Sequence, residues 1–235
     1  YYVVKDIGEI WAYETVGIFQ TEADVAASAN QDQLGAAWKA GDMQYADLNK
    51  DDKITPGVRT LDDHGDLRIV GNTTPRYSFG INGDISYKGI GLNVFFQGVM
   101  KRDYLPDNGN WNAFYPYNDG HLEKYAISES WTETNRDAYF AAPTFGYNTK
   151  KNIHPQSRYV QNASYIRLKN LSVSYQFPVK LIQKVRLNGA QIYFAGMNLW
   201  EATKMHKPLD PESVFTVTQE YYLQRIFTLG VKLNF

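Results

Sequence analysis

Apolar and polar side chains alternate through the last nine residues of the chain, 227–235. The apolar side chains occupy every second position, and they are Phe227, Leu229, Val231, Leu233 and Phe235. A period of two predicts a β-strand with one apolar and one polar face. Nine residues is also about the length of a tilted strand that crosses a bilayer. The pattern therefore leaves two interpretations open, a membrane-spanning strand and the edge strand of a soluble β-sandwich.

A second alternating stretch, 76–88, predicts the first strand of a hairpin. The glycines of Lys88-Gly89-Ile90-Gly91 suit a tight turn, and residues 92–100 alternate again as the returning strand. A further strand is predicted over 162–177. Its apolar positions change phase upstream of Leu171, which predicts a β-bulge or a stretch above the bilayer.

The remaining segments give weaker signals. Residues 1–19 and 187–199 predict irregular strands, and Thr21 with Asp24 predicts a capping box that opens a short helix through about Asn30. With 187–199 counted, the chain thus contains about five convincing strands and one uncertain strand at its start, whereas a closed barrel needs at least about eight. A lone sheet with one apolar face would aggregate. The sequence therefore predicts an all-β fold, the C-terminal strands of a larger antiparallel transmembrane β-barrel with long extracellular loops, and a chain that is part of a longer protein.

This interpretation divides the chain into four parts. Residues 1–75 carry a barrel strand and an extracellular loop with a short helix and an Asp/Asn-rich segment, and residues 76–101 form a transmembrane hairpin. Residues 102–158 form a long extracellular loop, since a connection of this length is usually functional. Residues 159–235 supply the C-terminal strands.

Composition and motif content argue against several classes of function. The net charge is −1 and the Lys and Arg residues are scattered, which argues against nucleic acid as a partner. The absence of cysteine excludes disulfides, thiolate metal sites and a cysteine nucleophile. The four histidines have no paired spacing, and neither a GxSxG elbow nor a phosphate-binding loop occurs. We therefore expect a protein that is not an enzyme.

Asp47, Asn49 and Asp51 place oxygen-bearing side chains at alternate positions, as in the first half of a calcium-binding loop. Two positions depart from that pattern, because Asp52 stands where the turn glycine is expected and Val58 where a bidentate Glu is expected. The alternative is a solvated turn rich in Asp and Asn. Calcium is thus the one cofactor that the sequence suggests.

The long connection carries aromatic residues among Asn, Asp and Glu, and the candidate ligand-binding residues are Trp111, Tyr115 and Tyr117. Aromatic faces beside polar groups suit sugar rings, whose C–H faces stack while their hydroxyls form hydrogen bonds. The alternative is that these aromatics pack the loop itself or contact a partner protein.

An ordered set of sequence blocks resembles the C-terminal region of the SusC/RagA-type family of TonB-dependent outer-membrane transporters. The blocks are residues 9–13, 17–20, 41–51, 65–77, 92–98, 162–171, 198–199, 210–212 and Phe235. The most specific of them is 162–171. The alternating ending, 227–235, resembles the assembly signal of outer-membrane barrels. The family usually has glycine where Lys50 or Asp52 stands, so this chain departs from it at the Asp/Asn-rich segment.

The resemblance implies a barrel of about 22 strands with an N-terminal plug, embedded in the lipid bilayer of the bacterial outer membrane. It also implies a SusD-like surface lipoprotein as a lid, and import powered by the TonB complex through an N-terminal part that this chain does not contain. Pairing of two barrel–lipoprotein units is a further implication. The cargo would be a large nutrient, commonly an oligosaccharide and sometimes a peptide. The rival function is a secreted or surface carbohydrate-binding β-sandwich, whose apolar strand faces would form a closed core.

Overall fold

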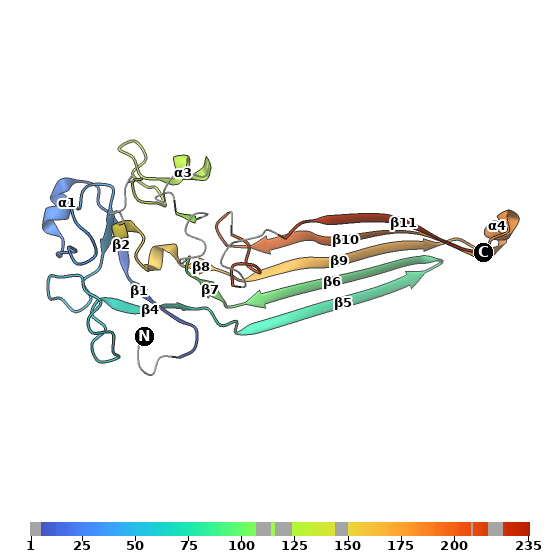
Figure 1. Ribbon diagram of the computed structural model, residues 1–235, viewed down its shortest axis with the longest axis horizontal. Coiled ribbons are helices and arrows are strands. Elements are labelled where there is room, and N and C mark those ends of the chain that lie inside the picture. The colour runs from blue at the N-terminus through green and yellow to red at the C-terminus, as the bar shows by residue number, and fades with distance from the viewer. Residues whose placement is uncertain (1–5, 107–113, 116–123, 144–149, 208, 216–222) are drawn as a thin grey trace.

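The computed structural model describes residues 6–106, 114–115, 124–143, 150–207, 209–215 and 223–235. Figure 1 shows an elongated molecule with a long sheet at one end and a body of loops and short strands at the other. We call this second region the loop body; it comprises the described residues of 6–75, 101–164 and 204–215. Among the described residues, no helix is long and apolar enough to cross a membrane.

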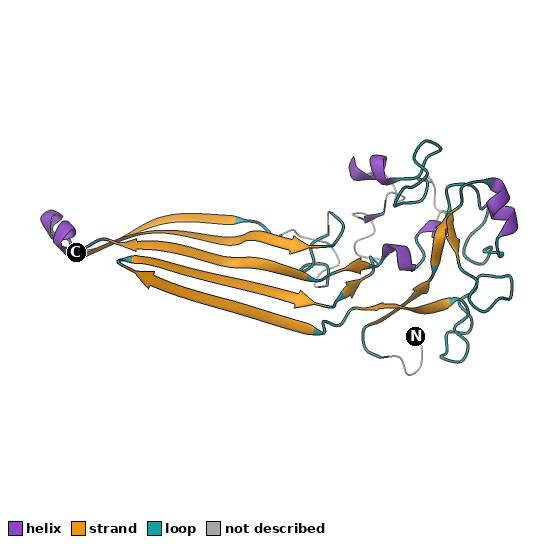
Figure 2. Cartoon of the chain, turned by 180° about the vertical axis from the view of Figure 1, so that it is seen from behind, coloured by secondary structure: helices purple, strands orange, loops and turns teal. Residues whose placement is uncertain are grey.

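The long sheet has five antiparallel strands in the order β11-β10-β9-β6-β5. They are β5 (Tyr77–Tyr87), β6 (Ile90–Met100), β9 (Tyr165–Gln176), β10 (Gly189–Thr203) and β11 (Ile226–Asn234). The sheet is a single layer, and no described helix or strand covers either face between its two ends (Figure 2).

β5 and β6 form the hairpin that the alternation predicts. Its turn is Lys88-Gly89, two residues shorter than predicted, and both residues have positive φ (48° and 88°) as a type I′ turn requires. The predicted bulge is also present, because Phe95 pairs with Asn170 and Phe96 with Leu168, which leaves Lys169 unpaired.

The connections differ between the two ends of the sheet. At the turn end lie the β5–β6 turn and the β9–β10 connection, which contains α4 (Val179–Ile182) and the 3₁₀ turn η3 (Gln183–Val185). At the loop end, residues 101–164 connect β6 to β9, and residues 204–225 connect β10 to β11. Short connections on one rim and long ones on the other are typical of outer-membrane barrels.

The loop body is held by three pairs of short strands and by several short helical segments. The strand pairs are β1 (Glu9–Tyr13) with β4 (Leu67–Asn72), β2 (Thr15–Ile18) with β3 (Met43–Tyr45), and β7 (Asp103–Tyr104) with β8 (Gln161–Asn162). The helical segments are α1 (Glu22–Ala27), α3 (Lys124–Glu129), η1 (Lys150–Asn152) and η2 (Ser157–Tyr159). The Thr21–Asp24 capping box is present, but α1 ends earlier than predicted.

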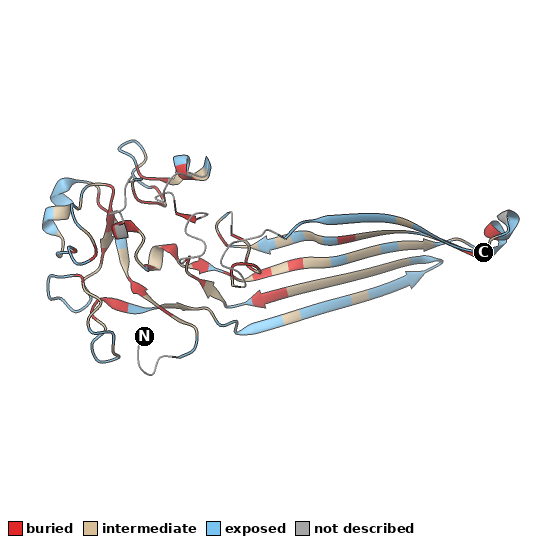
Figure 3. Cartoon of the chain, viewed as in Figure 1, coloured by how far each residue is buried: buried red, intermediate tan, exposed pale blue. Residues whose placement is uncertain are grey.

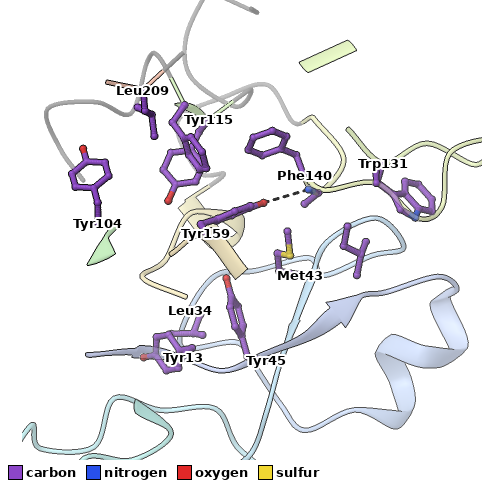
Figure 4. Packing of buried hydrophobic residues seen from close by; sticks show 14 of the residues in the cluster. Tyr13, Leu34, Met43, Tyr45, Tyr104, Tyr115, Trp131, Phe140, Tyr159 and Leu209 are labelled. Atoms are coloured by element: carbon purple, nitrogen blue, oxygen red, sulfur yellow. Dashed lines mark hydrogen bonds between the residues drawn. The ribbon is translucent and has the colours of Figure 1, made fainter. Parts of the chain in front are cut away.

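The main buried hydrophobic cluster lies in the loop body, whereas the sheet is mostly exposed or half-buried (Figure 3). Tyr159 is fully buried beside Tyr115 and Phe140 (Figure 4). The ring centres of Phe114, Tyr115 and Phe140 lie 5.7, 5.1 and 5.6 Å from its own. The Tyr159 hydroxyl also accepts a hydrogen bond from the backbone N–H of Ala141 at 3.5 Å. The loops are therefore packed around an aromatic core.

Candidate functional site

Register places most apolar side chains of the five long strands on one face of the sheet. Three rows run across it, and they are Ile85–Leu92–Val173–Phe194–Leu229, Tyr87–Ile90–Tyr175–Ile192–Val231 and Gly83–Val94–Leu171–Gly196–Phe227. The face is open, since Leu229 is 75% exposed and Ile85 65%. A continuous apolar surface of this size is unusual on a water-soluble monomer.

The opposite face of the same strands is polar. Asp84, Asn93, Ser172 and Thr228 lie in one row across it, together with Ala195. The Asn93 amide donates a hydrogen bond of 2.8 Å to the Asp84 carboxylate. The sheet is therefore amphipathic, as expected of a barrel that faces lipid outside and a polar lumen inside.

The dimensions of the strands and their free edges agree with a membrane barrel. The nine residues of β11 extend about 30 Å, or about 23 Å after a tilt of ~40°, which matches the apolar band of outer-membrane barrels. β5 and β11 each have one edge without a strand partner among the described residues. Because unpaired backbone groups are very unfavourable in lipid, these edges must pair with further strands of a closed barrel. The fold thus defines part of a transmembrane β-barrel wall.

A charged cluster joins the loop end of the sheet to the β10–β11 loop. The side chain of Arg167 on β9 is only 3% exposed, and it pairs with Glu201 on β10, with Asp210 at 2.9 Å and with Glu212 at 2.5 Å. Lys169 adds a second cation 3.0 Å from Glu212. A buried guanidinium needs such partners. Arg167 and Lys169 belong to the sequence block 162–171, and Asp210 and Glu212 belong to the block 210–212. The cluster explains why these two blocks occur together, because their side chains are in contact.

Two other sequence blocks supply fully buried carboxylates that organise the loop body. Asp42 accepts hydrogen bonds of 2.9 Å from the Asn152 amide and the Lys39 backbone N–H, and it lies 2.6 Å from the Lys151 ammonium. Asp66 accepts hydrogen bonds of 2.7 Å from the backbone N–H groups of residues 48 and 55. Each carboxylate therefore links loop segments that are distant in sequence.

Burial also shifts the titration of tyrosines in this core. Desolvation raises the pKa of Tyr45 and of Tyr115 well above the usual value, and burial likewise raises the pKa of Tyr139. The hydroxyls therefore stay protonated and can donate: Tyr45 to the Lys151 carbonyl at 2.8 Å, and Tyr139 to the Arg158 carbonyl at 3.1 Å.

The three predicted ligand-binding aromatics have different outcomes. Trp111 and Tyr117 lie outside the described residues. Tyr115 is 3% exposed, with its ring centre 4.9 Å from that of Phe114 and 5.1 Å from that of Tyr159. For Tyr115, the structure favours the alternative in which the loop aromatics pack the loop itself.

A cleft that the sequence did not reveal lies beside β1 in the loop body. It has a volume of about 610 Å³, and its lining includes Trp11, Leu34, Arg59 and His154. An indole and an imidazole beside a guanidinium can hold a ligand with both apolar and polar groups. These residues come from four separate segments, so no local pattern could have joined them.

The Asp/Asn-rich segment forms a hydrogen-bonded turn. The Asp47 carboxylate accepts from the backbone N–H groups of Lys50 at 2.6 Å, Asp51 at 3.3 Å and Asp52 at 2.8 Å, and the Asn49 amide oxygen accepts from Asp51 at 3.2 Å. Lys50 and Asp52 have φ of 62° and 60°, the left-handed conformation that favours glycine. Within the described part of the chain, no three His, Cys, Asp or Glu side chains are grouped to hold a metal. Calcium binding by Asp47, Asn49 and Asp51 stays a prediction.

The amphipathic sheet, its free edges and its long loops define an outer-membrane β-barrel protein. No family model matches the chain. It is 27% identical to TonB-dependent receptor P3 of Formosa agariphila, over 97% of this chain and 22% of the receptor. It is 26% identical to TonB-dependent receptor P26 of the same organism, over 84% of this chain and 21% of the receptor.

Solved structures of a peptide transporter, RagAB, share the fold. One aligns with a TM-score of 0.63 at 21% identity, over 97% of this chain and 22% of that chain, and the "open-open" state aligns with 0.61 at 22% identity. The chain thus spans about a fifth of the length of these proteins. The resemblance to SusC/RagA-type TonB-dependent transporters, the antiparallel barrel fold and the outer-membrane location are confirmed. The rival sandwich would need a second sheet over the apolar face, and the described residues place none there.

Proposed function

We propose that the chain is part of a TonB-dependent outer-membrane importer of large nutrients. The observation that carries the proposal is the two-faced sheet, with an open apolar face, a polar face and long connections at one end only. Such a wall separates lipid from a polar passage, and the loops stand at the mouth of that passage. The relatives are named receptors and transporters, and the proposal assigns the chain no catalytic step.

Two cargo classes follow from different observations. Oligosaccharides fit the aromatic and polar composition of the long connection, which includes Trp111 and Tyr117. Peptides are supported by the likeness to RagAB, which is described as a peptide importer. We propose oligosaccharides as the first class to test, with peptides as the alternative.

The proposal includes the partners expected from the family resemblance. A SusD-like lipoprotein would cover the loop end, and the TonB complex would supply energy through a part of the protein outside this chain. Two barrel–lipoprotein pairs would then associate. A tagged form of the natural protein that contains this chain should co-purify with a lipoprotein from outer membranes solubilised in detergent, and purification without one would contradict the lid.

The barrel assignment can be tested with two adjacent positions on β9. The chain has no cysteine, so Ser172→Cys on the polar face and Val173→Cys on the apolar face each introduce one thiol into it. In intact outer membranes, a small water-soluble maleimide should label Ser172→Cys and leave Val173→Cys unlabelled. Detergent with urea should make both reactive. Equal labelling of the two thiols in the membrane would show that the faces are assigned wrongly.

Uptake tests the activity itself. Cells that produce the natural protein should accumulate a fluorescent oligosaccharide, whereas cells lacking it should not, and a protonophore should stop accumulation because TonB coupling needs the inner-membrane proton gradient. A fluorescent oligopeptide tests the second cargo in parallel. If neither class enters in a protein-dependent manner, the importer proposal is wrong.

A further inference from the structure

The two connections at the turn end of the sheet carry four exposed cations and no acidic side chain. Lys88 lies in the β5–β6 turn, and Lys180, Lys184 and Arg186 lie in the β9–β10 connection, all with exposed side chains. Residues 85–91 and 174–191 contain no Asp or Glu, although the whole chain carries a net charge of −1. We call these four residues the cationic rim.

The two connections that carry the cationic rim are neighbours in space. The Gln176 backbone N–H donates to the Gly89 carbonyl at 2.7 Å, which fixes the β5–β6 turn beside the end of β9. The β9–β10 connection begins at the next residue, and both connections lie beyond the same end of the sheet (Figure 1). The four positive charges therefore belong to one rim of the barrel.

Several cations at the opposite end of the molecule are neutralised within the fold. Lys151, Arg167 and Lys169 are all paired with carboxylates in or beside the loop body. Among the described residues, by contrast, Lys180 and Arg186 make no ion pair, and neither does Lys184. Their charge is thus directed to solvent or to a partner rather than neutralised within the fold.

Apolar side chains accompany the cations. Val179 and Leu181 on α4 are 54% and 56% exposed, while Ile182 is buried beneath them. Phe177 has its ring centre 5.1 Å from that of Tyr175, a member of the apolar face, and Lys180 follows three residues later. Exposed aliphatic groups beside lysines, directly after a lipid-facing band, are the composition of a segment at the headgroup level of a membrane.

We propose that the cationic rim, with Val179 and Leu181, is a docking surface for anionic phospholipid headgroups in the leaflet next to the short turns. The partner follows from charge complementarity and from continuity with the lipid-facing sheet. A cation close to an anionic membrane surface is worth about a fivefold change in affinity. Short turns lie on the periplasmic side of outer-membrane barrels, so the headgroups would belong to the periplasmic leaflet.

Lipid titration in native mass spectrometry tests this proposal. The natural protein that contains this chain is delipidated in detergent and titrated separately with phosphatidylglycerol and with phosphatidylethanolamine. The wild type should bind phosphatidylglycerol more tightly. A triple variant, Lys180→Gln/Lys184→Gln/Arg186→Gln, should lose this preference, with binding weaker by about tenfold or more.

A matched control removes three exposed cations from the loop body, as Lys39→Gln/Lys50→Gln/Lys53→Gln. Lys50 and Arg186 have nearly the same left-handed φ, 62° and 59°, so the two triple variants carry a comparable backbone strain. The control should keep the phosphatidylglycerol preference. An equal loss in the control, or a wild type that binds both lipids alike, would overturn the proposal.

Folding of each variant is checked by its heat-dependent mobility shift on a gel. If the rim triple variant fails to fold, Lys184→Gln alone and a salt series on the wild type replace it. Phosphatidylglycerol binding should then weaken as ionic strength rises, because exposed charges are screened. Phosphatidylglycerol binding that is independent of salt and of Lys184 would exclude headgroup docking. If instead the protein shows no lipid preference but binds an acidic polypeptide in a salt-sensitive manner, the partner of the rim is a protein.

Discussion

The loop body and the long sheet bury their apolar residues in opposite ways. Phe140 and Tyr159 in the loop body are fully buried, whereas Leu229 and Ile85 in the sheet are among the most exposed large apolar residues. The two regions are built from the same residue types, so composition does not explain the difference. The loop body excludes water with its own core, and the sheet depends on the bilayer to cover its apolar face. The same chain therefore covers its apolar side chains in two ways, with a protein core in the loop body and with lipid on the sheet.

The largest effect is expected from removing a core ring in the loop body. Phe140→Ala deletes a fully buried side chain that contacts Phe114 and Tyr159, and we expect it to destabilise the loop body by about 3–5 kcal/mol. The sheet should still assemble, since Phe140 lies far from its apolar face. Limited proteolysis should cut the loops faster, while the heat-dependent gel shift stays unchanged.

Ile127→Ala is the control for this variant, because Ile127 lies on α3 in the same loop body but is exposed. It should leave proteolysis unchanged. If Phe140→Ala also prevented barrel assembly, the two regions would not be as independent as their burial indicates.

The converse experiment disturbs the sheet and leaves the loop body intact. Leu229→Arg places a charge on the lipid face in the middle of β11, and we expect a cost of about 2–4 kcal/mol to folding in the membrane. Thr228→Arg, one residue away on the polar face, should cost much less. Urea titration of folding into vesicles measures both. Similar costs for the two variants would mean that β11 does not separate lipid from lumen.

A smaller change is expected at the Asp/Asn-rich turn. Lys50 has a φ of 62°, and a non-glycine residue in that conformation costs roughly 1–2 kcal/mol. Lys50→Gly should therefore stabilise the loop body by about 1 kcal/mol, measured as slower proteolysis, without effect on the sheet. Lys53→Gly, a nearby position without positive φ, should not stabilise it. Calcium titration of both variants tests the metal prediction for Asp47, Asn49 and Asp51.

The buried tyrosines should leave the stability of the loop body independent of pH near neutrality. Their folded pKa values are raised above the unfolded value of about 10, so their contribution to stability is complete below pH 10 and is lost as the pH rises toward the folded pKa. The loop body should therefore keep its protease resistance from pH 6 to 9 and lose it above about pH 10. Unfolding that begins near pH 8 would contradict this assignment.

Alternation predicted four of the five long strands, because a period of two is a local signal that assigns each side chain to a face, whereas β10 alternates poorly and gave only a weak signal. The same alternation predicted which side chains of β6, β9 and β11 lie on the apolar face. The loop body was not predicted, because its core joins residues such as Tyr13, Phe114 and Tyr159 that have no common period. The family-like blocks contain Asp42, Asp66 and Arg167, but only the fold shows that these residues hold loops together.

The loop body joins the connections that lead into β5, from β6 to β9 and from β10 to β11 through one shared core. If the proposed passage opens at its loop end, the three connections must therefore move as a unit, because separate movement would expose the aromatic cluster to water. At the other rim the strands are joined only by short links. We therefore expect a change in one loop-end connection to be transmitted to the other two, whereas none of the described links at the other rim contributes to this core.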